Sequence, residues 1–217
     1  MTTRSLLDKE LNKLRAHLLN MESKIQSAVA HSIQALKEQN RELAQQIIDA
    51  DEEINKLRYK IEKLGVMIIA TQQPMASDLR IIIASMHVAI EMERMGDHAA
   101  GIAQLAIKLS DDPMLKPLID IPRMADVAQN MLHDSIQAFM TNDADMAKAI
   151  AKRDDELDQL YNQILRELLT YMMEDPHTIH RATYLLWVAH GLERIGDRVT
   201  NVSERVLFME TGKFKEL

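Results

Sequence analysis

The pentapeptide Glu-Arg-Met-Gly-Asp at residues 93–97 recurs as Glu-Arg-Ile-Gly-Asp at residues 193–197, one hundred positions later. Residues four apart lie on one face of a helix, so each copy would set a glutamate and an aspartate side by side. Like charges at this spacing cost about 0.2–0.5 kcal/mol, and a glycine inside a helix costs about 1 kcal/mol relative to alanine. Because both copies of the pentapeptide carry these costs in stability, the pattern indicates a function that offsets them. The missing glycine side chain leaves space between the acids for a metal ion or a neighbouring helix.

The composition limits the classes of protein that the chain can belong to. Its 217 residues are enough to bury a sizeable core, and 47% of them are hydrophobic. A net charge of -7 argues against a nucleic-acid-binding protein and favours cations or basic partners. The absence of cysteine excludes disulfides, thiolate metal sites and cysteine nucleophiles. That absence also suits a reducing cytoplasm. Residues 1–20 do not resemble a signal peptide, and no apolar run is long enough to cross a bilayer.

The pattern of apolar residues predicts helices throughout. Six glycines, five prolines and 4% aromatic residues leave little material for turns and strands. Apolar residues recur every three or four positions along residues 6–39 and again along residues 43–64, which predicts two amphipathic helices separated by a break near Asn40. Pro74 would end the second helix, and a third would carry the first pentapeptide to about Ser110.

The second half of the sequence repeats the first. Residues 32–35 and 135–138 both read Ser-Ile-Gln-Ala, an offset of 103. At the same offset, Asp-Glu-Glu-Ile-Asn at residues 51–55 is matched by Asp-Asp-Glu-Leu-Asp at residues 154–158. Three matches in the same order predict an all-α protein of two tandem three-helix bundles related by an internal repeat. Prolines at positions 113, 117 and 122 predict a linker, so the expected domains are residues 1–110, linker 111–122 and residues 123–217.

The spacing along each helical hairpin predicts that the acidic pairs meet. The first pair of each repeat lies about as far before its hairpin proline as the second pair lies after it, in arms of about 32 Å and 29 Å at 1.5 Å per residue. Antiparallel helices would therefore place the pairs opposite each other. The candidate ligands are Asp51, Asn55, Glu93 and Asp97 in the first repeat and Asp154, Asp158, Glu193 and Asp197 in the second.

Clustered oxygen ligands form a hard site, which suits divalent or trivalent ions such as Mg, Ca, Mn or iron ahead of Zn. In a competing interpretation, Arg94 and Arg194 neutralise the acids as ion pairs and no metal binds, which would leave a metal-free helical scaffold. A carboxylate-bridged di-metal enzyme of the ferritin-like type is a further alternative. Such enzymes carry Glu-x-x-His on helices, and the one match, at residues 174–177, contains a proline and lies at a hairpin tip.

Several motifs together resemble the PhoU family of accessory and regulatory proteins of bacterial phosphate-specific transport. Gln73-Pro74 with Ala-Ser-Asp-Leu-Arg at residues 76–80 is similar to the family's first hairpin. Leu-Leu-Thr-Tyr-Met-Met-Glu-Asp at residues 168–175 is similar to its second, and both Glu-Arg-x-Gly-Asp elements match as well. The resemblance extends over nearly the whole chain.

The resemblance implies a non-enzymatic negative regulator of the phosphate regulon that also modulates phosphate uptake. Its implied partners are the ATPase of the phosphate-specific ABC importer and the phosphate-sensing histidine kinase. The protein would be a cytoplasmic homodimer that reaches the inner membrane only through these partners. The resemblance also implies metal clusters on the paired acidic motifs, one using Asp51, Glu93 and Asp97 and the other using Asp154, Asp158, Glu193 and Asp197. Asn55 departs from the carboxylate pattern of the family.

Overall fold

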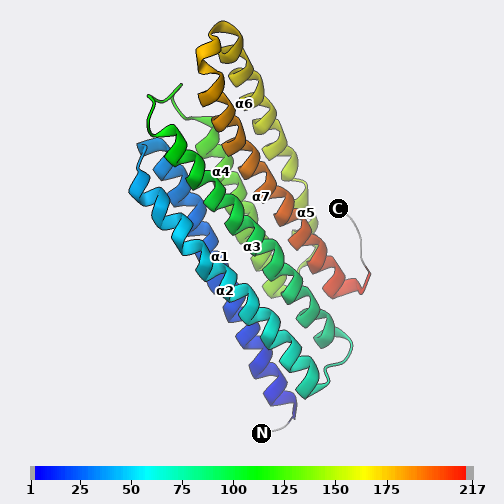
Figure 1. Ribbon diagram of the computed structural model, residues 1–217. Helices are drawn as coiled ribbons and strands as arrows, with labels where there is room; N and C mark the ends of the chain where they lie inside the picture. The colour runs from blue at the N-terminus through cyan, green and yellow to red at the C-terminus, as the bar shows by residue number, and fades with distance from the viewer. Residues whose placement is uncertain (1–2, 214–217) are drawn as a thin grey trace.

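The computed structural model describes residues 3–213, and every regular element in this range is helical (Figure 1). This confirms the prediction of an all-α fold. The elements are α1 (Thr3–Glu38), α2 (Arg41–Gln72), α3 (Ser77–Leu109), α4 (Asp120–Thr141), α5 (Ala144–Ala151), α6 (Asp154–Glu174), the 3-10 turn η1 (Pro176–Thr178) and α7 (Ile179–Thr211).

The turn that follows the first helix is built alike in the two predicted repeats. Gln39 and Asn142, which are 103 positions apart, both take a left-handed backbone conformation, with φ of 53° and 57°. The next residue in each repeat caps a helix: Asn40 accepts a hydrogen bond from the backbone N–H of the residue three positions on, and Asp143 does the same. Polar side chains at this position satisfy helix N–H groups that have no partner within the helix. The offset of 103 therefore holds in three dimensions.

The middle helix of the second repeat is broken, whereas the sequence predicts one continuous helix there. The helix equivalent to α2 is divided into α5 and α6 at Lys152 and Arg153. At the break the backbone forms i to i−3 hydrogen bonds, from the N–H of Arg153 to the carbonyl of Ile150 at 2.9 Å and from the N–H of Glu156 to the carbonyl of Arg153 at 3.0 Å. Three acids in the first turn of α6 suit the positive end of the helix dipole. Asp154 consequently becomes the first residue of a helix.

α4 begins earlier than the linker prolines predict. α4 begins at Asp120, so Pro122 lies in its first turn, within the linker range 111–122 that the sequence suggests. Proline is tolerated there because the N–H groups of a first helical turn have no intrahelical acceptor. The domain boundaries themselves stay a prediction.

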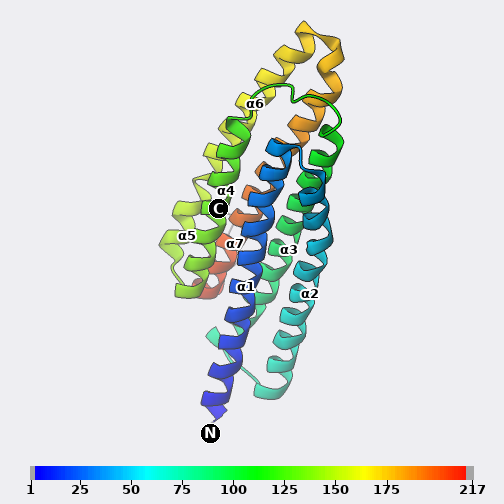
Figure 2. The ribbon, with the colours of Figure 1, turned by 90° about the vertical axis from the view of Figure 1, so that its left-hand side faces the viewer.

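α3 and α7 run antiparallel through the centre of the molecule (Figures 1 and 2). Arg80 near the start of α3 donates a hydrogen bond to the carbonyl of Met209 near the end of α7, and Arg181 near the start of α7 donates one to Pro113 beyond the end of α3. α1 packs on α3, α4 packs on α7, and α2 and α6 lie outside these pairs. The α2–α3 and α6–α7 hairpin tips therefore point to opposite ends of the molecule (Figure 1).

A reciprocal contact between α1 and α4 marks the approximate twofold relation of the repeats. The side-chain amide of Gln26 donates to the carbonyl of Gln129 at 2.7 Å, and that of Gln129 donates to the carbonyl of Gln26 at 2.9 Å. These residues are also 103 positions apart. The buried Leu, Ile, Met and Ala side chains of both repeats join one core, so the repeats pack as a single body.

Candidate functional site

The repeated glycines allow each acidic helix pair to pack closely. A Cβ atom on Gly96 would lie 3.1 Å from Oδ1 of Asp51 and 3.0 Å from the side chain of Ile54. A Cβ atom on Gly196 would lie 2.7 Å from Oδ1 of Asp154, closer than real Cβ contacts come. Glycine therefore lets an aspartate of the neighbouring helix cross the motif helix closely, with less room to spare at Gly196 than at Gly96. The spacing of the pairs along their hairpins predicted this crossing.

In the first repeat, the structure brings Asp51 of α2 to Glu93 and Asp97 of α3. Asp51 accepts a hydrogen bond from the side-chain amide of Asn55 through Oδ2, at 3.2 Å, while Oδ1 is buried with no hydrogen-bond partner. Burial raises the pKa of the Asp51 carboxyl, and the negative charges of Asp97 and Glu93 raise it further, against the opposing hydrogen bond of Asn55. The first site thus holds a carboxylate whose charge is poorly compensated.

An arginine that the sequence interpretation missed lies at the first site. Nη1 of Arg58 is 3.4 Å from Glu93, and Nη2 is 3.2 Å from Glu62 on its own helix. Arg94, which the ion-pair interpretation placed against the acids, instead lies 3.8 Å from Glu91. Arg58 follows Asp51 by seven positions, which is two helical turns, so the same face of α2 carries both residues. That spacing is the one signal that could have identified it.

In the second repeat, four carboxylates converge between α6 and α7. Burial raises the pKa of Asp154 to about 6, with further contributions from the charges of Asp197, Asp158 and Glu193. Burial and then Asp197 also raise the pKa of Glu193. Oδ1 of Asp154 is buried with no hydrogen-bond partner, like its counterpart Asp51. The second site therefore concentrates more negative charge than the first.

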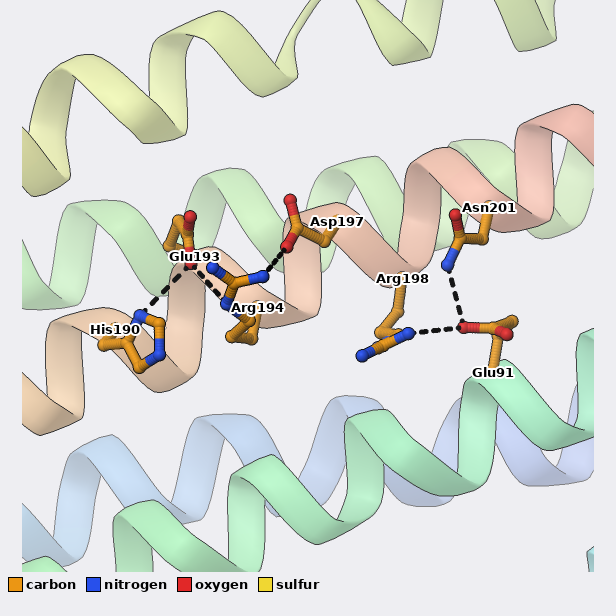
Figure 3. A network of polar contacts seen from close by, with 7 residues as sticks. All are labelled: Glu91, His190, Glu193, Arg194, Asp197, Arg198 and Asn201. Carbon is orange, nitrogen blue, oxygen red and sulfur yellow. Dashed lines mark hydrogen bonds and ion pairs between the residues drawn. The ribbon is translucent and has the colours of Figure 1, made fainter. Parts of the chain in front are cut away.

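Arg194 partly compensates this charge (Figure 3). Its Nη1 lies 2.7 Å from Asp197 and its Nε lies 3.2 Å from Glu193, and Nδ1 of His190 lies 3.4 Å from Glu193. The arginine of the motif therefore pairs with the acids in the second repeat but not in the first. His190 is half-exposed, and burial followed by the charge of Arg194 lowers its pKa.

The donor set suits a hard cation. Carboxylate and amide oxygens are the donors that Mg, Ca, Mn and iron prefer. Buried carboxylate oxygens without hydrogen-bond partners, on Asp51 and Asp154, leave donor capacity for such an ion. In residues 3–213 no three His, Asp or Glu side chains already have the spacing of a formed metal site. Arg58 and Arg194 neutralise part of the charge of Glu93 and Asp197, at 3.4 Å and 2.7 Å.

The one Glu-x-x-His match of the ferritin-like alternative lies away from these sites. Glu174 ends α6 and His177 lies in η1, at the hairpin tip. Asp154 lies at the opposite end of α6, about 30 Å away at 1.5 Å per residue.

Fold and sites define a class: a tandem helical-repeat protein with an acidic site between two antiparallel helices in each repeat. The chain belongs to the PhoU family, because the PhoU domain matches residues 18–106 and again residues 121–206. Both matches contain one complete acidic site.

Relatives that are similar over almost the whole chain support this assignment. A phosphate-specific transport system accessory protein PhoU homolog of Pseudomonas putida is 40% identical, with 94% of this chain and 80% of the relative covered. A homolog with the same description from Aquifex aeolicus is 39% identical, with 95% and 94% covered.

Two crystal structures share the fold. PhoU from Pseudomonas aeruginosa superimposes with a TM-score of 0.89 at 37% identity, covering 95% of this chain and 99% of that one. The phosphate transport system regulatory protein PhoU from Streptococcus pneumoniae gives a TM-score of 0.90 at 31% identity, covering 97% and 100%. The resemblance to the PhoU family that the sequence motifs indicated is confirmed.

Within residues 3–213, no helix combines the length and the apolar character that a membrane span requires.

Proposed function

We propose that this protein is a non-enzymatic negative regulator of the phosphate regulon. It couples a phosphate-specific ABC importer to its sensor histidine kinase and modulates phosphate uptake. The observation that carries the proposal is identity of about 40% to phosphate-specific transport system accessory proteins, over 94% of this chain. Relatives that align across both repeats share the whole architecture. A regulator that acts by binding other proteins depends on the surfaces that this architecture presents.

The acidic sites give this regulator a place to hold cations. Asp51, Glu93 and Asp97 would hold a cation in the first repeat, with Asn55 adding a neutral amide oxygen. In the second repeat the ligands would be Asp154, Asp158, Glu193 and Asp197. A bound ion would supply the positive charge that relieves repulsion between these carboxylates, and would stabilise the fold by mass action. Iron, Mn, Mg and Ca suit the oxygen donors, ahead of Zn.

The proposed partners are proteins of the inner membrane system. The importer ATPase and the kinase would recruit the protein to the cytoplasmic face of the membrane, where it acts as a homodimer. Removing the importer should release the protein from membranes, which fractionation of importer-deficient cells measures. Unchanged membrane association in those cells would contradict recruitment through the importer.

The regulatory role is tested by deletion in the organism that carries the gene. Phosphate-starvation genes should stay on in phosphate-rich medium, and a wild-type copy should restore repression. A copy with Asp97→Asn and Asp197→Asn should restore less repression than a matched copy with the exposed acids changed, Asp49→Asn and Asp155→Asn. Full repression in the deletion strain would overturn the proposed role. Full restoration by the Asp97 and Asp197 double variant would overturn the part played by the acidic sites.

A further inference from the structure

The first repeat contains a surface cavity that adjoins its acidic site, because Asp51 and Gly96 both line it. The cavity has a volume of about 380 Å³ and lies between α1 and α2, which run side by side (Figure 2). Its walls are largely apolar, formed by Ala28, Leu43, Ile47, Ala50 and Ile54. His31 stands on the α1 side and Ala50 on the α2 side, and both are exposed to solvent.

The second repeat fills the equivalent place with an arginine. At the offset of 103, Ala50 corresponds to Arg153 and His31 corresponds to Asp134. Nη1 of Arg153 donates to Oδ2 of Asp134 at 2.6 Å, which bridges the break before α6 to α4. Both side chains are about two thirds buried, with 36% and 34% of their surfaces exposed. The cavity is thus the space that an arginine side chain takes in the other half of the molecule.

The charges around the cavity suit a cationic occupant. Its lining includes the carboxylates of Asp51 and Glu53 and one ammonium group, that of Lys24. Lys24 lies 2.5 Å from Glu53, which leaves the Asp51 carboxylate as the excess charge. The apolar walls suit an aliphatic stem, because arginine buries its methylene groups against apolar surface while its head remains polar.

We propose that this cavity binds an arginine side chain presented by a partner protein. The stem lies against Ala28, Ala50 and Ile47, and the guanidinium group lies toward the Asp51 and Glu53 side. The bound arginine takes the space that the Arg153 side chain takes in the second repeat, but its head turns toward Asp51 and Glu53, because His31 replaces the Asp134 carboxylate that pairs with Arg153. The proposal rests on the cavity and on the comparison of the repeats, and it does not depend on the proposed regulatory role.

A matched pair of small molecules tests the proposal. N-propylguanidinium reproduces the arginine side chain, and N-propylurea is its neutral counterpart of nearly the same shape. Nuclear magnetic resonance titration of the full chain, without added divalent metal, should show saturable shifts centred on Ala28 and Ala50 with propylguanidinium. Binding of propylurea should be about tenfold weaker, the change expected from losing one charge-assisted hydrogen bond. Equal binding of the two molecules, or no saturable shift with either, would overturn the proposal.

Variants in which one repeat receives the residues of the other test whether the cavity is the binding site. Ala50→Arg with His31→Asp should place the second repeat's ion pair in the cavity and weaken propylguanidinium binding at least about tenfold. Ala30→Arg, at an exposed alanine outside the cavity lining, should leave binding unchanged. The reverse exchange, Arg153→Ala with Asp134→His, should open a second cavity and raise the number of sites from about one to about two per chain. Undiminished binding in the filled variant, or no added site in the opened one, would contradict the assignment.

Discussion

The two acidic sites hold equivalent positions in the repeats but differ in charge. In the first, three carboxylates and Asn55 face an arginine from α2, since Arg58 lies 3.4 Å from Glu93. In the second, four carboxylates face Arg194 from the motif itself, 2.7 Å from Asp197. The glycines, the aspartate that crosses each of them and the helix crossing are retained in both. The duplication therefore preserved the position of the acids, while the compensating charges diverged.

The packing around the glycines differs as well. An added Cβ would lie 2.6 Å from Leu157 at Gly196, whereas the shortest such distance at Gly96 is 3.0 Å, to Ile54. The side chains of α6 thus lie closer to Gly196 than those of α2 lie to Gly96. The second site therefore combines the higher charge with the tighter packing.

The largest expected effect is that of a methyl group at Gly196. Gly196→Ala should lower the free energy of unfolding by about 1–3 kcal/mol, because Leu157 and Asp154 must move. Gly96→Ala should cost less than about 1 kcal/mol, since the helical preference of alanine offsets most of a milder contact. Gly101→Ala is the matched control: no atom lies within 4 Å of its Cβ, so a gain of up to about 1 kcal/mol is expected. Urea denaturation measures all three, and equal losses at Gly96 and Gly196 would contradict the packing difference.

The charge difference predicts unequal loss of metal. Asp197→Asn should remove more bound cation, and more of the metal-dependent rise in melting temperature, than Asp97→Asn. Cation affinity follows the number of charged ligands, and the second site starts with one carboxylate more. The loss of affinity at the second site should be at least the roughly 10–100-fold typical of residues that only support a ligand. Metal analysis and thermal unfolding of chelator-treated and reloaded protein provide the measurement. A larger effect of Asp97→Asn would make packing around the sites, and not charge count, the determinant of affinity.

The raised pKa of Asp154 predicts a pH-dependent stability in the presence of a chelator. The pKa of Asp154 is about 6 in the folded chain against an ordinary value of 3.8 for aspartate, so the folded state binds more protons between these values. Stability contributed by this group is present below about pH 4 and is lost as pH rises through about 6. Asp154→Asn should therefore raise the free energy of unfolding at pH 7 by roughly 1–2 kcal/mol, after allowance for solvent screening, with little change at pH 4. Asp51→Asn should act in the same direction. An equal rise in the free energy of unfolding at pH 4 and pH 7 would show that the raised pKa is not its cause.

The smallest expected effect comes from converting the first site toward the second. Asn55→Asp adds the missing carboxylate, and Arg58→Tyr places there the residue found 103 positions later, Tyr161. Each change should strengthen cation binding at the first site by less than about tenfold, because both residues are partly solvated. Lys56→Gln, which removes an exposed cation paired with Glu52, is the control and should have almost no effect. Calorimetric titration compares the variants, and weaker binding after Asn55→Asp would contradict the charge argument.

Much of this arrangement could be predicted from the sequence because it follows from helical periodicity. Equal arm lengths on either side of Pro74 and Pro176 place Asp51 opposite residues 93–97 and Asp154 opposite residues 193–197, whatever the details of packing. The glycine in each motif indicated a close approach, and the structure shows which atoms make it.

The remaining features depend on side-chain conformations and packing that periodicity does not specify. Arg94 and Arg194 occupy the same place in their motifs, yet one lies near Glu91 and the other near Asp197. The break before Asp154 has no proline or glycine to mark it. The cavity between α1 and α2 arises because Ala50 is small where its counterpart is an arginine, a difference that acquires meaning only once the helices are packed.

The asymmetry of the two sites is tested most directly by adding Mn²⁺ stepwise to chelator-treated protein. The paramagnetic ion broadens nearby amide signals, and Gly96 and Gly196 each report on one site. We expect the Gly196 signal to disappear at a lower Mn²⁺ concentration than the Gly96 signal. Loss of the Gly96 signal first, loss of both together, or the persistence of both at saturating Mn²⁺ would contradict the account.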